Sequence, residues 1–379
     1  MTKVAKTPKF GLLFLSLALC AVGLVGICSV FLNGQEASYN VSREVPLGLL
    51  LMGYAFFVGI SVGVATIATA DHLFGFHAFS KISRHLQLLA IAALLAAFWL
   101  IFWELGSPFK LQVLRFVRYY FNFAVESPIW WMSTFYLIET PLLIIELILM
   151  LKNSEKASFY AGIVAFIMGI VAFSTLSMVF AVNSARPIWH TPSFTISFIF
   201  GALICGISVI FAFVNLSKKA LNERILRNLN IFMFLLLLAV LFINFWGIVI
   251  SSYGSGSYLA KNFEVFTNGN LSFNFYVFEI CIGILLPMIL LILSKFQNLK
   301  ISFLAGILAI IGVFFARFDG IVGGQLVKVE SEFLGKIEFG SYCPSVAEIT
   351  IFISGIGVML FIYALGKTFL NLESENERA

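Results

Sequence analysis

Residues 128–151 read PIWWMSTFYLIETPLLIIELILML, a stretch apolar enough to cross a membrane that nevertheless carries two carboxylates. A bilayer core of about 30 Å is crossed by roughly 20 residues of helix. Glu139 and Glu146 stand two helical turns apart, so both acids lie on one face of that helix. Acids inside a membrane are rare, usually face a bundle interior or a wet cavity, and usually serve a function. The stretch therefore predicts a functional acidic face. The alternative is a pair of acids that neighbouring helices satisfy, without chemistry.

The composition extends this conclusion to the whole chain. Its 379 residues have a mean hydropathy of +1.00, with 60% hydrophobic and only 11% charged residues. A soluble domain carries about 25% charged residues, and no polar segment here is long enough to build a soluble core. We therefore predict an all-α polytopic membrane protein. The net charge of +5 comes from short connections between spans and is no indication of nucleic-acid binding.

About ten transmembrane helices are expected from the apolar runs. These runs are residues 10–32, 45–70, 86–103, 129–151, 157–182, 193–216, 229–251, 273–293, 301–316 and 346–365. The first is longer than the apolar region of a signal peptide, so we expect it to stay as an anchor. The second carries Gly59 and Gly63, a spacing of small residues that lets helices approach closely.

The ninth run is unusual because it is short. Residues 301–316 would rise only about 24 Å as a helix, which is less than the hydrocarbon thickness. Arg317 and Asp319 follow at once, and Gly323, Gly324 and Gln325 come next. Either the helix is short or the two charged residues are drawn into the bundle. The pattern favours a helix that breaks inside the protein near its outer face.

Basic residues orient the spans. With the N-terminus inside, 15 of the 24 Lys and Arg residues fall in the cytoplasmic segments, which are also the shorter ones. The positive-inside rule then predicts a multi-pass protein of the bacterial cytoplasmic (inner) membrane with both termini cytoplasmic. The outer connections 104–128, 252–272 and 317–345 are long, and ordered loops of such length are usually functional. Their aromatic residues and mixed charge suit the docking of a partner protein, although plain solvated loops fit equally well.

Cysteines and histidines are poorly placed for a bound metal. The five cysteines contain no C-x-x-C pair, which excludes a cysteine-ligated iron–sulfur cluster or structural zinc within this chain. A membrane haem needs histidines well inside facing helices. His72, His77 and His85 are expected in a cytoplasmic loop and His190 at the outer end of the fifth span. We therefore expect no haem, no iron–sulfur cluster and no metal. The three clustered histidines could pass protons to the membrane interior, or simply form a polar loop.

Five short motifs, in order along the chain, resemble those of one family. They are Glu104-Leu105-Gly106-Ser107-Pro108, Ser127-Pro128-Ile129-Trp130-Trp131, the segment from Ala185-Arg186-Pro187 to His190-Thr191-Pro192, Arg317-Phe318-Asp319 with Gly324-Gln325, and Tyr342-Cys343-Pro344-Ser345 with Glu348. The ordered set resembles the NrfD/PsrC family of polysulfide reductase-type membrane subunits, in its ten-helix branch. The family usually has aspartate, arginine and asparagine where this chain has Glu104, Ser107 and His190.

The resemblance implies an integral membrane subunit of a respiratory oxidoreductase complex, without a redox cofactor of its own. Such a subunit exchanges electrons between the quinone pool (menaquinone or ubiquinone, as exchangeable substrate) and an extracytoplasmic ferredoxin-like iron–sulfur subunit, with coupled proton transfer. That partner connects to a molybdopterin enzyme, a hydrogenase or a multihaem cytochrome. The resemblance also implies two four-helix bundles, residues 45–192 and 193–325, with flanking helices and tails in residues 1–44 and 326–379.

The residue chemistry points to a quinone site at the outer end of the first bundle. Quinone chemistry couples electrons to protons, so the site needs hydrogen-bond partners and a proton acceptor. We expect Glu139, Glu104 and Arg186 to be the catalytic residues. The residues expected to bind the quinone are Tyr54, Trp130, Trp131, Tyr136, Asn183 and His190. A second polar set, which is either structural or a proton path, consists of Asn274, Glu279, Arg317, Asp319 and Gln325.

Two other functions fit part of the pattern. Ten spans with broken helices and buried acids are also compatible with a secondary transporter, although no inverted repeat is evident. A purely structural membrane anchor of a redox complex would need no quinone contact. The transporter predicts substrate binding by the isolated chain, and the anchor predicts indifference to substitution of the buried acids.

Overall fold

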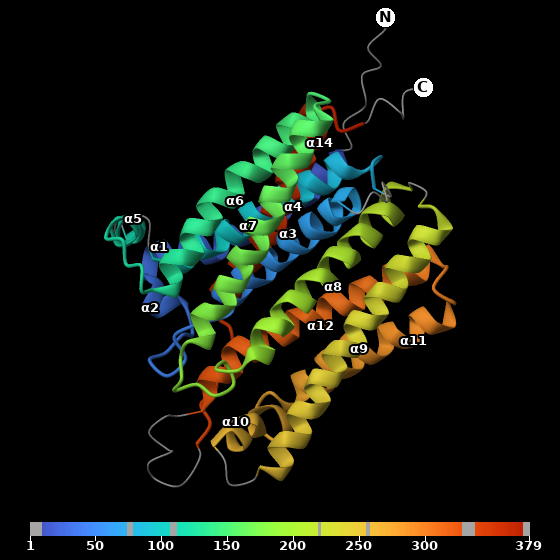
Figure 1. Ribbon diagram of the computed structural model, residues 1–379. Coiled ribbons are helices and arrows are strands. Elements are labelled where there is room, and N and C mark those ends of the chain that lie inside the picture. The colour runs from blue at the N-terminus through green and yellow to red at the C-terminus, as the bar shows by residue number, and fades with distance from the viewer. Residues whose placement is uncertain are drawn as a thin grey trace, which may run out of the picture.

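The computed structural model describes residues 10–73, 79–106, 112–218, 221–254, 258–327 and 338–373 (Figure 1). Ten helical segments among them are long and apolar enough to cross a membrane. They are α1 (Phe10–Asn33), α3 (Leu49–Leu73), α4 (Ser83–Glu104), α6 (Pro128–Leu151), α7 (Glu155–Ala181), α8 (Pro192–Ser217), α9 (Glu223–Tyr253), the continuous pair η2 (Asn274–Leu285) and α11 (Leu286–Leu293), α12 (Leu299–Leu326) and α14 (Val346–Phe369). The all-α polytopic membrane fold and the count of ten spans are confirmed.

The two ends of the bundle differ in character. The start of α1 and the end of α14 lie at one end, whereas the short helices α2 (Gln35–Ser38), α5 (Gln112–Phe121) and α10 (Tyr258–Thr267) lie at the other (Figure 1). We call this second end the loop end. Helices α5 and α10 belong to two of the long connections that were predicted to be outside. The orientation of the loop end relative to the membrane stays a prediction.

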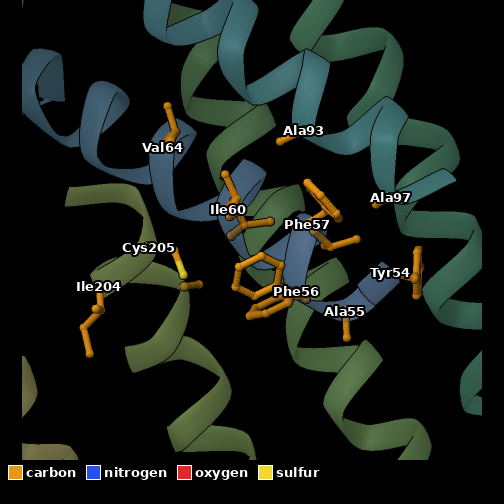
Figure 2. Packing of buried hydrophobic residues seen from close by; sticks show 14 of the residues in the cluster. Tyr54, Ala55, Phe56, Phe57, Ile60, Val64, Ala93, Ala97, Ile204 and Cys205 are labelled. Atoms are coloured by element: carbon orange, nitrogen blue, oxygen red, sulfur yellow. The ribbon is translucent and has the colours of Figure 1, made fainter. Parts of the chain in front are cut away.

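Helix α3 lies at the centre of the molecule, packed against α4, α7 and α8. Its side chains Phe56, Phe57 and Ile60 fill the space between α4 and α8 (Figure 2). Helix α6 packs against α7, α12 packs against α8 and η2, and α14 packs against α1 and α4. Helix α3 also packs against α8, on the other side of the predicted boundary between the two bundles at residue 192. The division into two bundles stays a prediction.

The contact between α3 and α8 is so close that it requires glycine. A Cβ atom on Gly63 would lie 1.9 Å from the carbonyl oxygen of Ala202, and one on Gly206 would lie 2.4 Å from the carbonyl carbon of Gly63. Small residues allow such backbone contact, and close packing is what holds helices together in lipid. The predicted close approach is confirmed at Gly63. At Gly59 the nearest atom to a Cβ is the ring end of Phe173, at 3.3 Å.

Helix α12 corrects the prediction of a break near the outer face of the protein. It continues to Leu326, and Arg317 and Asp319 are buried inside it, 3% and 1% exposed. The break is wrong and the alternative, two charged residues drawn into the bundle, is confirmed. The physical reason is that Arg317 finds its partners on α8. Its Nη2 donates to the carbonyl oxygens of Ser197 at 3.2 Å and of Phe198 at 2.7 Å.

The eighth span also departs from a regular α-helix. Residues Asn274–Leu285 form a π-helix, which continues into α11. Such wide helical turns are rare and occur frequently at functional sites. Glu279 and Gly283 lie within it, and a Cβ on Gly283 would lie 2.3 Å from the Cα atom of Gly312 on α12. The π-helix therefore packs backbone to backbone against α12 and places a carboxylate inside the bundle.

Candidate functional site

Glu139 is a buried acid whose hydrogen-bonding capacity is unused. It lies on α6, is 1% exposed, and neither carboxylate oxygen has a hydrogen-bond partner among the described residues. Room for the carboxylate comes from Gly169 on α7, where a Cβ atom would lie 2.7 Å from its Oε1. An ionised carboxylate without partners is costly to bury. The site is therefore suited to a group that meets a visiting hydrogen-bonding or proton-exchanging partner.

Two tyrosines stand beside this acid. Tyr136 lies one turn before Glu139 on α6, and its ring centroid is 6.3 Å from that of Tyr54 on α3. The ring of Phe98 on α4 packs edge-on against Tyr136 at 6.2 Å. The Tyr54 hydroxyl donates to the sulfur of Met132 at 3.9 Å, and the hydroxyl groups of Tyr54 and Tyr136 also interact with each other. Helices α3 and α6 thus bring together two phenols and one carboxylic acid, and α4 adds an aromatic ring.

The second acid of α6 is satisfied by its neighbours. Gln87 on α4 donates through Nε2 to the Oε2 atom of Glu146 at 2.9 Å and to the carbonyl oxygen of Leu143 at 3.0 Å. A Cβ on Gly162 of α7 would lie 2.6 Å from the Oε1 of Glu146. Both acids therefore face α7, which confirms the shared face. They differ because Glu146 has a partner and Glu139 has none among the described residues.

Trp130 and Trp131 hold the connection that follows α5. The Nε1 of Trp130 donates to the carbonyl oxygen of Tyr120 at 2.9 Å, and its ring stacks on that of Tyr120 at 5.8 Å. The Nε1 of Trp131 donates to the carbonyl oxygen of Val125 at 2.7 Å. Both indole N–H groups are thus occupied by backbone oxygens at the loop end.

Glu104 lies apart from Glu139 in a second polar cluster at the end of α4. Its Oε2 atom is buried without a hydrogen-bond partner among the described residues. Gln35 and Tyr39 both donate to the carbonyl oxygen of Trp103, at 2.6 and 3.2 Å. Burial, followed by the neighbouring Glu104 carboxylate, raises the pKa of Tyr39, so this hydroxyl stays protonated. Tyr342 donates to Oε1 of Glu348 in the same region, and it accepts from the amide of Leu49 at 2.8 Å.

The turn between α7 and α8 connects two parts of the protein. Arg186 donates through Nη1 to the carbonyl oxygens of Gln325 at 3.0 Å and of Val327 at 2.7 Å. The Oδ1 of Asn183 accepts from the amide of Ala185 at 3.2 Å, and the Nδ1 of His190 lies 2.6 Å from the carbonyl oxygen of Ala181. These three predicted site residues therefore organise the turn and fasten it to the end of α12. The structure brings together Tyr54, Tyr136 and Glu139 from the predicted site.

The second predicted polar set divides into two parts. Gln325 binds the backbone of Leu47, accepting at 2.9 Å and donating at 3.0 Å. Asn274, Glu279, Arg317 and Asp319 gather instead between α8, α9, η2 and α12. Asn244 on α9, which was not predicted from the sequence, donates to Glu279 at 2.7 Å. The one signal for it was an amide in the middle of an apolar run.

The histidine prediction needs one correction. His85 is not in a loop: it lies in the first turn of α4, is buried, and its Nδ1 is 3.0 Å from the hydroxyl of Tyr363. The apolar run predicted a span that begins only at residue 86. The helix begins earlier and includes His85, because Tyr363 and Phe213 cover the imidazole ring. His77 and Ser107 lie outside the described residues, as does the side chain of His72. The expectation of no haem, no iron–sulfur cluster and no metal stays a prediction.

Comparison with known proteins assigns the family. The model of the polysulphide reductase NrfD family matches residues 37–330, most of the chain. The chain belongs to the NrfD family. It is 25% identical over 376 residues to the Hdr-like menaquinol oxidoreductase integral membrane subunit of Archaeoglobus fulgidus, covering 95% of this chain and 93% of that protein. It is 20% identical over 396 aligned positions to a selenate reductase subunit of Mesobacillus selenatarsenatis, covering 91% of this chain and 90% of that protein. The resemblance read from the motifs is confirmed at the level of the family.

Proposed function

We propose that this chain is the integral membrane subunit of a respiratory oxidoreductase complex and exchanges electrons between the membrane quinone pool and an iron–sulfur partner. Membership of the NrfD family supports the proposal, as do the names of the two relatives, a menaquinol oxidoreductase subunit and a selenate reductase subunit. Ten membrane-spanning helices provide access to a lipid-soluble substrate. The partner is proposed to be a ferredoxin-like subunit that leads on to a molybdopterin enzyme, a hydrogenase or a multihaem cytochrome.

The observation that carries the proposal is the unpartnered carboxylate of Glu139 beside Tyr54 and Tyr136. A quinol presents two hydroxyl groups and releases two protons when it is oxidised. Neither oxygen of Glu139 has a hydrogen-bond partner among the described residues, so the carboxylate can accept a hydrogen bond and then a proton. The Tyr136 hydroxyl, next to that of Tyr54, is placed to bind the second quinone oxygen. A positioned general base contributes about 10²–10⁴-fold to a rate. In our proposal Glu139 exchanges the proton, while Tyr54 and Tyr136 hold the head group.

The remaining predicted residues act around this centre. Arg186 fixes the α7–α8 turn to the end of α12, and this keeps Asn183 and His190 in place within the turn. Trp130 and Trp131 hold the α5 connection over the start of α6. Glu104, with Tyr39 beside it, offers the next titratable group at the loop end. We propose that the loop end faces outward, that protons leave past Glu104, and that the iron–sulfur partner docks over α5 and α10.

The test is Glu139→Gln in the assembled complex. Glutamine keeps the shape and the hydrogen bonding but cannot exchange a proton, so quinone-linked turnover should fall by about ten-fold or more. Turnover with an artificial donor that bypasses the membrane should be unchanged. Glu155→Gln is the control, because Glu155 is an exposed acid at the start of α7. Full quinone-linked activity of an assembled Glu139→Gln complex would contradict the proposed role and favour a structural anchor.

A further inference from the structure

A cavity of about 470 Å³ lies in the second half of the chain, away from the Glu139 cluster. Its walls come from α8, α9, α10, η2 and α12, whereas Tyr54, Tyr136 and Glu139 belong to α3 and α6. The backbone contact between Gly63 and Gly206, where a Cβ on Gly206 would lie 2.4 Å from Gly63, joins α3 to α8 between the two regions. A volume of this size is typical of a pocket for a small organic molecule, for which about 300–1,000 Å³ is usual.

A fixed positive group forms one side of the cavity. The guanidinium of Arg317 lies over the ring of Phe198, with Cζ 3.8 Å from the ring centroid, and its Nη2 donates to two carbonyl oxygens of α8. Gly201 makes room for it, since a Cβ there would lie 2.5 Å from Nη2. A guanidinium held in this way is a donor with a defined position.

Two carboxylates face the same space. Glu279 accepts at Oε1 from the Nδ2 of Asn244 at 2.7 Å, and Asp319 accepts at Oδ1 from the Nδ2 of Asn274 at 3.2 Å. The Oδ2 of Asp319 is buried and has no hydrogen-bond partner among the described residues, although Asp319 lines the cavity. A buried acceptor without a partner is costly. It indicates a ligand that donates a hydrogen bond at this point.

The rest of the wall is apolar and reaches the lipid-facing surface. Aromatic rings of Phe194, Phe198, Phe263, Phe266 and Phe275 surround the polar groups. Trp246 and Ile250 of α9 line the cavity and are also 45% and 56% exposed, on a helix that faces mostly outward. The ligand can therefore enter from the bilayer, and its body must be apolar and preferably planar.

We propose that this cavity is a second binding site for a quinol of the membrane pool, distinct from the Glu139 cluster. The inference rests on the proposed function, because that function supplies the ligand. A hydroquinone has hydroxyl donors for Asp319 and Glu279, oxygen acceptors for Asn244 and Arg317, and a flat ring for the aromatic walls. A phosphate head group is disfavoured, because two carboxylates and one guanidinium line the cavity.

The experiment is photolabelling of the intact complex in membranes with an azidoquinone kept in its reduced, quinol form, followed by mass spectrometry of the labelled peptides. We expect label on peptides of α9 and η2 as well as on those of α3 and α6. Ile243→Trp places a large side chain in the cavity and should abolish the α9 and η2 label. Leu238→Trp is the matched control on the same helix, because Leu238 is 44% exposed and does not line the cavity. Asp319→Asn is the milder variant and should weaken the same label.

The outcomes separate this site from the proposed function. Glu139→Gln should reduce turnover and leave the α9 label in place. Label confined to α3 and α6, or an α9 label equal in the Ile243→Trp and Leu238→Trp complexes, would overturn the second site and leave the first intact. Labelling of α9 by a photoactivatable phospholipid but not by the azidoquinone would also overturn it. Absence of quinone label anywhere, with unchanged turnover in Glu139→Gln, would overturn both.

Discussion

Gly169 of α7 faces Glu139 of α6 so closely that a Cβ atom at position 169 would lie 2.7 Å from the Oε1 of the carboxylate. Seven residues earlier on α7, Gly162 stands in the same relation to Glu146 at 2.6 Å. Two helices thus meet through two matching pairs of a glycine and an acid. Only the pair at Glu139 leaves the acid without a hydrogen-bond partner among the described residues.

This relation predicts different consequences for two equivalent substitutions. Gly169→Ala should push the Glu139 carboxylate, the far end of a flexible side chain, away from its position. The loss of stability should be about 1 kcal/mol, at the low end of the cost of overpacking, and quinone-linked turnover should fall markedly. Gly162→Ala should cause a similar loss of stability and a much smaller loss of turnover, because Glu146 is not the proton-exchanging group. Thermal unfolding and steady-state kinetics of both assembled complexes provide the measurement. Equal turnover in the two variants would argue against a special role of Glu139.

A second pair of substitutions tests the packing of α3 on α8. The Cβ of Gly63→Ala would lie 1.9 Å from a backbone oxygen of Ala202, so the two helices must separate. We expect a loss of about 1–3 kcal/mol or more, as for other overpacked cores, and poor yield of the complex. Gly59→Ala should be tolerated, since its Cβ would meet only the ring end of Phe173, at 3.3 Å. Melting temperatures that do not differ between the two variants would contradict this view of the interface.

The orientation in the membrane is tested by the cysteines. Cys343 is exposed in the connection just before α14, while Cys28 and Cys281 are exposed within spans and would face lipid. A charged, membrane-impermeant maleimide should therefore label Cys343 in intact cells and should leave Cys28 and Cys281 unlabelled. Cys343→Ser provides the control. Labelling of Cys343 only in inside-out vesicles would reverse the proposed topology.

Hydropathy was sufficient to predict the ten spans, because a bilayer requires long apolar helices with internally satisfied backbones. Hydropathy failed where a neighbouring helix supplies the partners of a charged side chain. A break near the outer face was expected from the opposite charges of Arg317 and Asp319 and the glycines that follow them, but the ring and backbone of Phe198 receive Arg317 inside the bundle. The π-helical geometry of Asn274–Leu285 was not foreseen, since no rule of composition distinguishes it from an α-helix.

The candidate site was predicted only in its central part. The two-turn spacing placed Glu139 and Glu146 on one face, and α7 receives both. Arg186 was expected to be a catalytic residue, whereas its described hydrogen bonds include two to carbonyl oxygens at the end of α12. Asn244 and the cavity beside it could not be found from the sequence. They depend on how α9 packs against η2, and the residues involved are far apart in the chain.

The central claim is that Glu139 exchanges a proton with a quinone. Redox-induced infrared difference spectroscopy of the assembled complex tests it most directly, because the carbonyl stretch of a protonated carboxyl group is resolved from that of a carboxylate. We predict a carboxyl band that changes on quinone reduction in the wild type and in Glu146→Gln, and that is absent in Glu139→Gln. The same difference spectrum in the wild type and in an assembled Glu139→Gln complex would contradict the claim.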